Sequence, residues 1–83
     1  MKIQNIGSNK TEVTKNNGDT FLVSYSTVVA ALLTDGTGWV RTDRKYSVTT
    51  TKHINQWLKH HNAGRVTTIA QADLEARLEG GAL

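Results

Sequence analysis

The chain has 83 residues, of which 37% are hydrophobic and 20% charged, and its formal net charge at pH 7 is +3. A chain of this length forms one domain with a small core, and this hydrophobic content is too high for a disordered protein. Cysteine is absent, which excludes a disulfide framework and a thiolate metal site. The longest apolar run, residues 28–33, is much shorter than the roughly 18–20 residues of a membrane span, and the N-terminus lacks a secretory apolar region. We therefore expect a cytoplasmic protein without a membrane partner.

The first part of the chain is predicted to form antiparallel strands. Residues 12–15 and 20–25 flank Asn16-Asn17-Gly18-Asp19, a cluster of residues that tolerate a positive φ. Phe21, Val23 and Tyr25 alternate with Leu22 and Ser24, which fits the period of two of a strand. This pattern predicts a β-hairpin, and residues 3–6 are a candidate edge strand beside it.

A second hairpin is predicted immediately after the first. Residues 28–34 and 39–42 flank Asp35-Gly36-Thr37-Gly38, and an Asp-Gly pair between apolar runs is a strong hairpin signal. The Ala-Ala-Leu-Leu stretch at residues 30–33 is also compatible with a helix, so that alternative stays open. Residues 46–48 are a candidate for a further short strand.

The second half of the chain is predicted to be helical. An apolar stripe with the spacing i, i+3, i+4, i+7 consists of Ile54, Trp57, Leu58 and His61. It predicts a helix at about residues 51–62, capped by Thr50 or Thr51 and ended by Ala63-Gly64.

A capping-box pattern, Thr68 followed by Gln71, predicts a second helix at about residues 69–79. We thus expect a single domain over residues 1–83 of the α+β class. A three- or four-stranded antiparallel β-meander at about residues 3–48 is followed by two C-terminal helices, the first packed on one face of the sheet. Residues 80–83 are expected to fray. The expected core anchors are Phe21, Tyr25, Trp39 and Trp57.

The charge is distributed unevenly along the chain. Residues 41–65 carry a net charge of +5, whereas residues 1–40 are neutral and residues 66–83 carry −2. Hydroxyl side chains and the positive end of the helix dipole meet the cations of residues 44–53, which favours an anion such as phosphate. The alternative is that the threonines cap the helix and the charges form a solvated face. The candidate nucleic-acid or anion contacts are Arg41, Arg44, Lys45, Lys52, His53, Lys59 and Arg65.

No pattern in the chain predicts catalysis or metal binding. His53 and His60 lie seven residues apart and His60 and His61 are adjacent, so neither pair has the i, i+4 spacing that converges on one metal ion. The Gly-rich phosphate loops and the Gly-x-Ser-x-Gly nucleophile elbow are also absent. We therefore expect a non-enzymatic protein with no catalytic residues, no metal and no cofactor.

Three segments resemble a family of small proteins of unknown function encoded by tailed bacteriophages and prophages. They are residues 24–30, residues 41–50, and Lys52-His53-Ile54-Asn55-Gln56-Trp57-Leu58. The resemblance covers roughly residues 20–68, and Thr-Thr-x-Lys-His-Ile-Asn-x-Trp-Leu is its most specific part. It implies an accessory protein of a phage that acts in the cytoplasm of the bacterial host, and it carries over no activity or site residues.

Two functional hypotheses follow from these observations. In the first, the basic central segment contacts nucleic-acid phosphates, and Tyr46 or Trp39 stacks on bases if either is exposed, although a core position is favoured for both. In the second, the protein inhibits a host enzyme or defence factor by binding an acidic surface or by adding a strand at a sheet edge. A homodimer is a further possibility.

Overall fold

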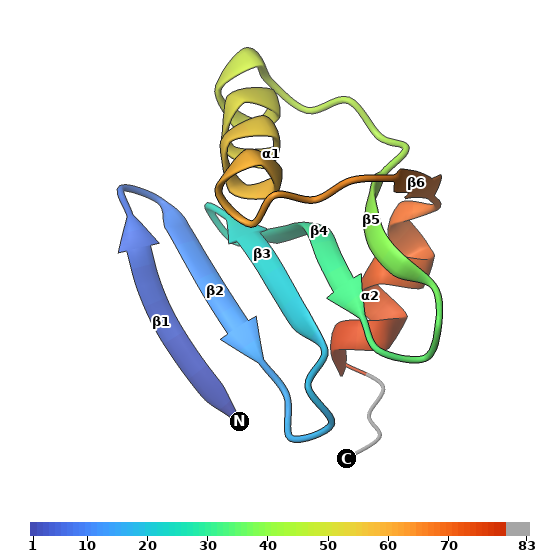
Figure 1. The fold of residues 1–83 in the computed structure, drawn as a ribbon. Coiled ribbons are helices and arrows are strands. Elements are labelled where there is room, and N and C mark those ends of the chain that lie inside the picture. Colours follow the sequence, from blue (N-terminus) through green and yellow to red (C-terminus); the bar gives the residue numbers. More distant parts are fainter. Residues whose placement is uncertain (80–83) are drawn as a thin grey trace.

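The computed structural model describes residues 1–79. Five strands come first, namely β1 (Lys2–Gly7), β2 (Lys10–Thr14), β3 (Thr20–Ser24), β4 (Thr27–Leu33) and β5 (Gly38–Thr42). They are followed by α1 (Val48–His60), β6 (Val66–Ile69) and α2 (Gln71–Glu79). All six strands form one sheet in chain order, antiparallel except for the parallel pair β5–β6 (Figure 1). The α+β class is confirmed, but the prediction of three or four strands is wrong because the sheet has six. The predicted fraying of residues 80–83 lies outside the described residues.

The two predicted hairpins are present. Val13 pairs with Phe21 across the first hairpin, and Ala31 pairs with Val40 across the second. Gly18 and Gly36 have φ values of 98° and 101°, which glycine adopts without a Cβ clash, so these turns follow from local sequence. The helical alternative for residues 30–33 is therefore wrong.

The start of α1 differs from the prediction. Residues 46–48 do not form a strand, because Ser47 is the N-cap of α1 and its Oγ accepts a hydrogen bond from the Thr50 backbone N–H at 3.1 Å. The helix thus begins three residues before the predicted residue 51. Thr50 turns inward and is buried, which is why it does not act as the cap.

The strand β6 was not predicted. It includes Ile69, the expected first residue of the second helix, and α2 begins instead at Gln71. All four residues of β6 are β-branched, and such residues favour a strand. Here this preference prevails over the Thr68 capping pattern. The Gln71 side chain donates to the Val28 carbonyl at 2.8 Å instead of reaching back along the chain. The Gln71 backbone N–H is directed at Asp43 Oδ1 at 3.3 Å, so a distant residue caps α2.

The two helices cover opposite faces of the sheet, which creates two apolar clusters. Trp57 and Ile54 of α1 pack on Leu22, whereas Leu74 of α2 packs on the face that carries Phe21. This arrangement requires a bulge between β3 and β4, because Val29 is an extra residue between the pairs Leu22–Ala30 and Val23–Val28. The bulge directs Val28 to the α2 cluster and both Val29 and Ala30 to the α1 cluster.

Three of the four predicted core anchors lie in or against the core. Phe21 and Trp57 are buried, and Trp39 is half-buried against the α1 cluster. The prediction for Tyr25 is wrong, since its side chain is 55% exposed. Tyr25 occupies the β3–β4 turn with a φ of 57°, and this turn interrupts the alternation on which the prediction depended. Within residues 1–79, no helix combines the length and the apolar character needed to span a membrane.

Candidate functional site

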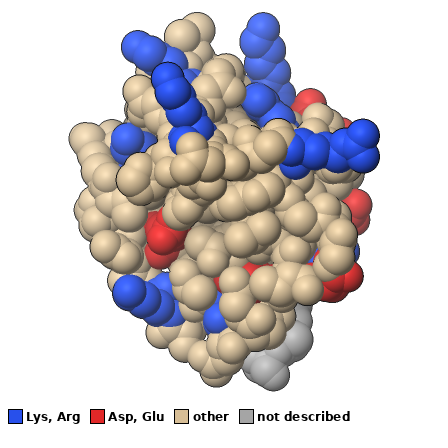
Figure 2. Space-filling model, viewed as in Figure 1, with Lys and Arg blue, Asp and Glu red and all other residues tan. Residues whose placement is uncertain are grey.

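Helix α1 carries cations on its exposed side and contains no Asp or Glu. Lys52 and Lys59 project from this side and are exposed, and two further exposed cations, Arg44 and Lys45, lie in the loop that precedes the helix. Figure 2 shows Lys and Arg side chains gathered in the upper part of the view, where Figure 1 places α1 and this loop. The acidic side chains visible in that view lie mostly along its right edge and lower half.

We name this surface the basic face. It comprises Arg41, Arg44, Lys45, Lys52, Lys59 and Arg65. Arg41 is half-buried on β5 and directs Nη1 at Asn55 Oδ1 of α1 at 3.3 Å; Arg65 is exposed between α1 and β6. The ion pairs of residues 1–79 are His61–Glu12 and Arg77–Asp35, so no member of the basic face is neutralised by a carboxylate there.

Three members of the basic face line one hollow of about 250 Å³. Arg41, Arg44 and Lys45 share it with Tyr46, whose side chain is 40% exposed, and with the first two turns of α1. Tyr46 was expected in the core and lies instead at the surface, among cations. Asp43 also lines the hollow, which therefore brings three cations, one carboxylate and one aromatic ring side by side.

His53 does not belong to this surface. Its side chain is buried, its Nδ1 lies 2.8 Å from Ser24 Oγ in a hydrogen bond, and its ring faces Tyr25 at a centroid distance of 6.0 Å. Burial lowers the pKa of His53, and the positive charge of Lys10 lowers it further. His53 is thus a neutral packing residue at neutral pH and is removed from the predicted set of anion contacts.

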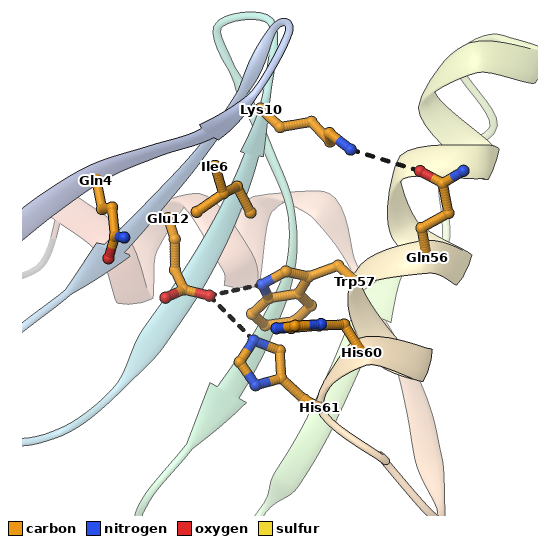
Figure 3. Close-up of a pocket in the computed structure, with 8 residues that line it drawn as sticks. All are labelled: Gln4, Ile6, Lys10, Glu12, Gln56, Trp57, His60 and His61. Atoms are coloured by element: carbon orange, nitrogen blue, oxygen red, sulfur yellow. Dashed lines mark hydrogen bonds and ion pairs between the residues drawn. The ribbon is translucent and has the colours of Figure 1, made fainter.

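On the opposite flank of α1 lies a groove that the sequence patterns did not indicate, with a volume of about 490 Å³ (Figure 3). We name it the α1–β2 groove. Its strand side carries Gln4 and Ile6 of β1 and Lys10 and Glu12 of β2, and its helix side carries Gln56 and His60.

A carboxylate lies at the base of this groove. Glu12 Oε1 accepts hydrogen bonds from Trp57 Nε1 at 2.8 Å and from His61 Nε2 at 3.0 Å, as the dashed lines in Figure 3 show. Trp39 packs edge-on against Trp57 with ring centroids 5.5 Å apart, which holds the indole in place. Within residues 1–79, no group donates to the second oxygen of Glu12.

The remaining histidines and acidic residues do not assemble a metal centre in the described part of the chain, where no group of three or more His, Asp or Glu side chains could hold an ion.

A second acidic site, Asp19, is occupied by internal hydrogen bonds. Burial opposes its ionisation, but hydrogen bonds from Thr34 and Asn17 outweigh that effect and lower its pKa.

The protein is thus a small α+β protein in which a cationic helix lies on a six-stranded sheet. Residues 1–76 match the model of a family of unknown function (DUF8033), and the chain belongs to this family. Neither the curated proteins nor the solved structures contain a match.

Proposed function

We propose that the protein binds nucleic acid through the basic face, as a non-enzymatic accessory protein encoded by a phage and acting in the cytoplasm of its bacterial host. The phage origin is suggested by the resemblance of residues 20–68, with Thr-Thr-x-Lys-His-Ile-Asn-x-Trp-Leu as its most specific part. The observation that carries the binding proposal is the basic face itself, six cations around one helix with no carboxylate partner among residues 1–79.

Unpaired surface cations on one side of a protein favour a polyanion as the partner. Each phosphate contact releases condensed counterions, so several such contacts provide affinity that falls steeply with salt concentration. The exposed Tyr46 ring beside Arg44 and Lys45 adds a surface on which a base can stack, as in proteins that bind single strands.

The test is a titration of a labelled oligonucleotide at several salt concentrations. We expect wild-type protein to bind at low salt, and the change of Arg44, Lys45 and Lys52 to Ala to flatten the slope of log K against log salt by about two to three. The three side chains are exposed, so each should contribute less than about 1 kcal/mol to the free energy of unfolding.

Two single substitutions control for net charge. Lys52→Ala removes one exposed lysine from the basic face, and Lys2→Ala removes one exposed lysine from β1, so only the first should weaken binding. Glu79→Lys adds a positive charge at the end of α2 and should not reduce binding. The absence of binding at low salt contradicts the proposal, and wild-type affinity in the triple variant places the site elsewhere.

A second candidate function is inhibition of a host enzyme or defence factor by protein binding. The observation that favours it is the edge strand β1, whose first five residues are exposed, with Ile3 at 68%. Such an edge can accept a strand from a partner, and the basic face offers complementarity to an acidic surface. Affinity capture from bacterial lysate with and without nuclease distinguishes the two, because only captured nucleic acid and its bound proteins disappear after digestion.

A further inference from the structure

We propose that the α1–β2 groove is a pocket for one base of a single-stranded nucleic acid, and that it prefers guanine over thymine or uracil. This inference rests on the proposed function, because it assigns to the same ligand a second, base-reading site beside the basic face. It depends on three observations: the position of the groove, its walls, and the two charged groups inside it.

The groove opens directly beside two lysines of the basic face. Gln56, which lines it, is four residues after Lys52 and three residues before Lys59 on α1. Residues at these spacings are neighbours on a helix surface, with Cβ atoms about 5–6 Å apart. A strand whose phosphates contact these lysines therefore has its bases at the mouth of the groove.

The walls of the groove fit a planar, partly apolar group. A volume of about 490 Å³ lies within the usual range for small-molecule sites and accommodates a nucleoside. Ile6 contributes an apolar surface from β1, and the exposed His60 ring contributes a flat one from α1. A base that enters between them buries both of its faces, an interaction that every base makes and that alone gives no preference.

The preference comes from Lys10 and Glu12, which lie two residues apart on β2 and both line the groove. The second oxygen of Glu12 only accepts hydrogen bonds, and the Lys10 ammonium only donates them. Trp57 and His61 hold the other oxygen of Glu12, so the carboxylate cannot rotate away from the groove. Lys10 reaches Gln56 Oε1 at 3.5 Å, a contact long enough to be exchanged for a ligand.

Guanine complements this pair of groups best. Its neighbouring N1–H and N2–H₂ groups point the same way and can both donate to the one free oxygen of Glu12, and the adjacent O6 accepts from the Lys10 ammonium. Adenine and cytosine each present one amino donor beside an acceptor. Thymine and uracil present a single N3–H group between two carbonyl oxygens, which the carboxylate repels. We therefore expect the order guanine, then adenine and cytosine, then thymine and uracil.

The experiment compares a labelled strand of about ten thymidines with the same strand carrying one central guanine, a length within the usual site size. Fluorescence anisotropy at low salt should show the guanine strand binding about tenfold tighter, the effect of one hydrogen bond to a charged group. Glu12→Gln should abolish this difference, and because it removes the repulsion between the carboxylate and thymine, the affinity for the all-thymidine strand should not decrease.

A matched pair of variants tests the wall of the groove. Ile6→Ala should reduce the preference for guanine, whereas Ile3→Ala, on the same strand but the opposite face, should not. Ile6 is 37% exposed and Ile3 is 68% exposed, so both variants should fold, and thermal melting checks this for each variant, including Glu12→Gln.

The outcomes separate the two proposals. Equal affinity of wild-type protein for the two strands overturns the guanine pocket and leaves nucleic-acid binding by the basic face intact. If neither strand binds at low salt, the proposed function fails, and guanosine monophosphate and uridine monophosphate are then titrated while amide shifts are followed by NMR. Shifts around Glu12 and Gln56 with the guanine nucleotide alone support the pocket, and their absence overturns it.

Discussion

The His53 side chain lies between α1 and the β3–β4 turn, where it contacts Ser24 and Tyr25. Ser24 is buried and also lies 3.4 Å from Thr50 Oγ1, so three polar side chains satisfy one another beneath the helix. This small network replaces hydrogen bonds to water that burial removes. It is also why a histidine within the basic segment contributes no surface charge.

The lowered pKa of His53 makes the stability of the protein depend on pH. The ordinary pKa of the side chain is 6.5, and the folded state lowers it, so below about pH 6.5 the unfolded chain binds more protons than the folded one. The free energy of unfolding should therefore decrease as the pH falls from about 7 to 5. His53→Gln removes the titration, so its melting temperature should fall less over this range than that of wild type.

The control for this prediction is His60→Gln, which changes an exposed histidine on the same helix. It should retain the wild-type dependence on pH. An identical fall in melting temperature for wild type and His53→Gln would contradict the assignment. Asp19 does not interfere, because its lowered pKa gives a stabilising contribution that is present above its ordinary pKa of 3.8 and is lost only as the pH falls through and below that value.

At the scale of elements, the stability of α1 depends strongly on the hydrogen bond that caps its first turn. The helix has no acidic residue in this turn to complement the dipole, so Ser47 provides the main local compensation for the unpaired N–H groups. Its Oγ accepts from Thr50 N, and the two hydroxyl groups lie 3.3 Å apart. The same absence of acidic side chains leaves the basic face unneutralised.

Ser47→Ala should therefore destabilise the protein by about 1 kcal/mol, the usual effect of removing an N-cap hydroxyl. Thr49→Ala, an exposed position two residues later, should change the free energy of unfolding by less than about 0.5 kcal/mol. Urea unfolding of both variants measures the difference. Equal stability of Ser47→Ala and wild type would mean that the cap is energetically unimportant.

At the scale of the whole molecule, Trp57 connects α1 with strands that are distant from it in the chain. Its ring packs in the α1 cluster and against Trp39, and its indole N–H is bonded to Glu12, which is 45 residues away. Only 3% of the side chain is exposed. One residue thus holds α1 on the sheet and sets the position of the carboxylate in the α1–β2 groove.

Trp57→Ala should unfold the protein or lower its melting temperature severely. Large-to-small changes of this kind cost roughly 3–5 kcal/mol, and domains have about 5–15 kcal/mol of stability in total. Val48→Ala, on the same helix with 79% exposure, should have little effect. Thermal melting compares them, and a Trp57→Ala variant that melts within a few degrees of wild type would contradict the assigned core role.

The sequence alone determined the elements whose signals are local. The hairpins β2–β3 and β4–β5 follow from turn residues and alternation within about 20 residues, and the body of α1 follows from its apolar stripe. The concentration of positive charge in residues 41–65 was also evident, because charge does not depend on the fold.

Only the tertiary structure decided which of these residues share a surface. The strand β6 pairs with β5, although the whole of α1 separates the two strands in the chain. The strand preference of its four residues competes with a helix-capping pattern that the local sequence supports equally well. Burial of His53 depends on where α1 crosses the sheet, whereas Tyr25 and Tyr46 are exposed because they lie in the β3–β4 turn and in the loop before α1. The α1–β2 groove joins Glu12 to His61, 49 residues apart, and a contact at that separation forms only when packing of the apolar clusters brings both elements together.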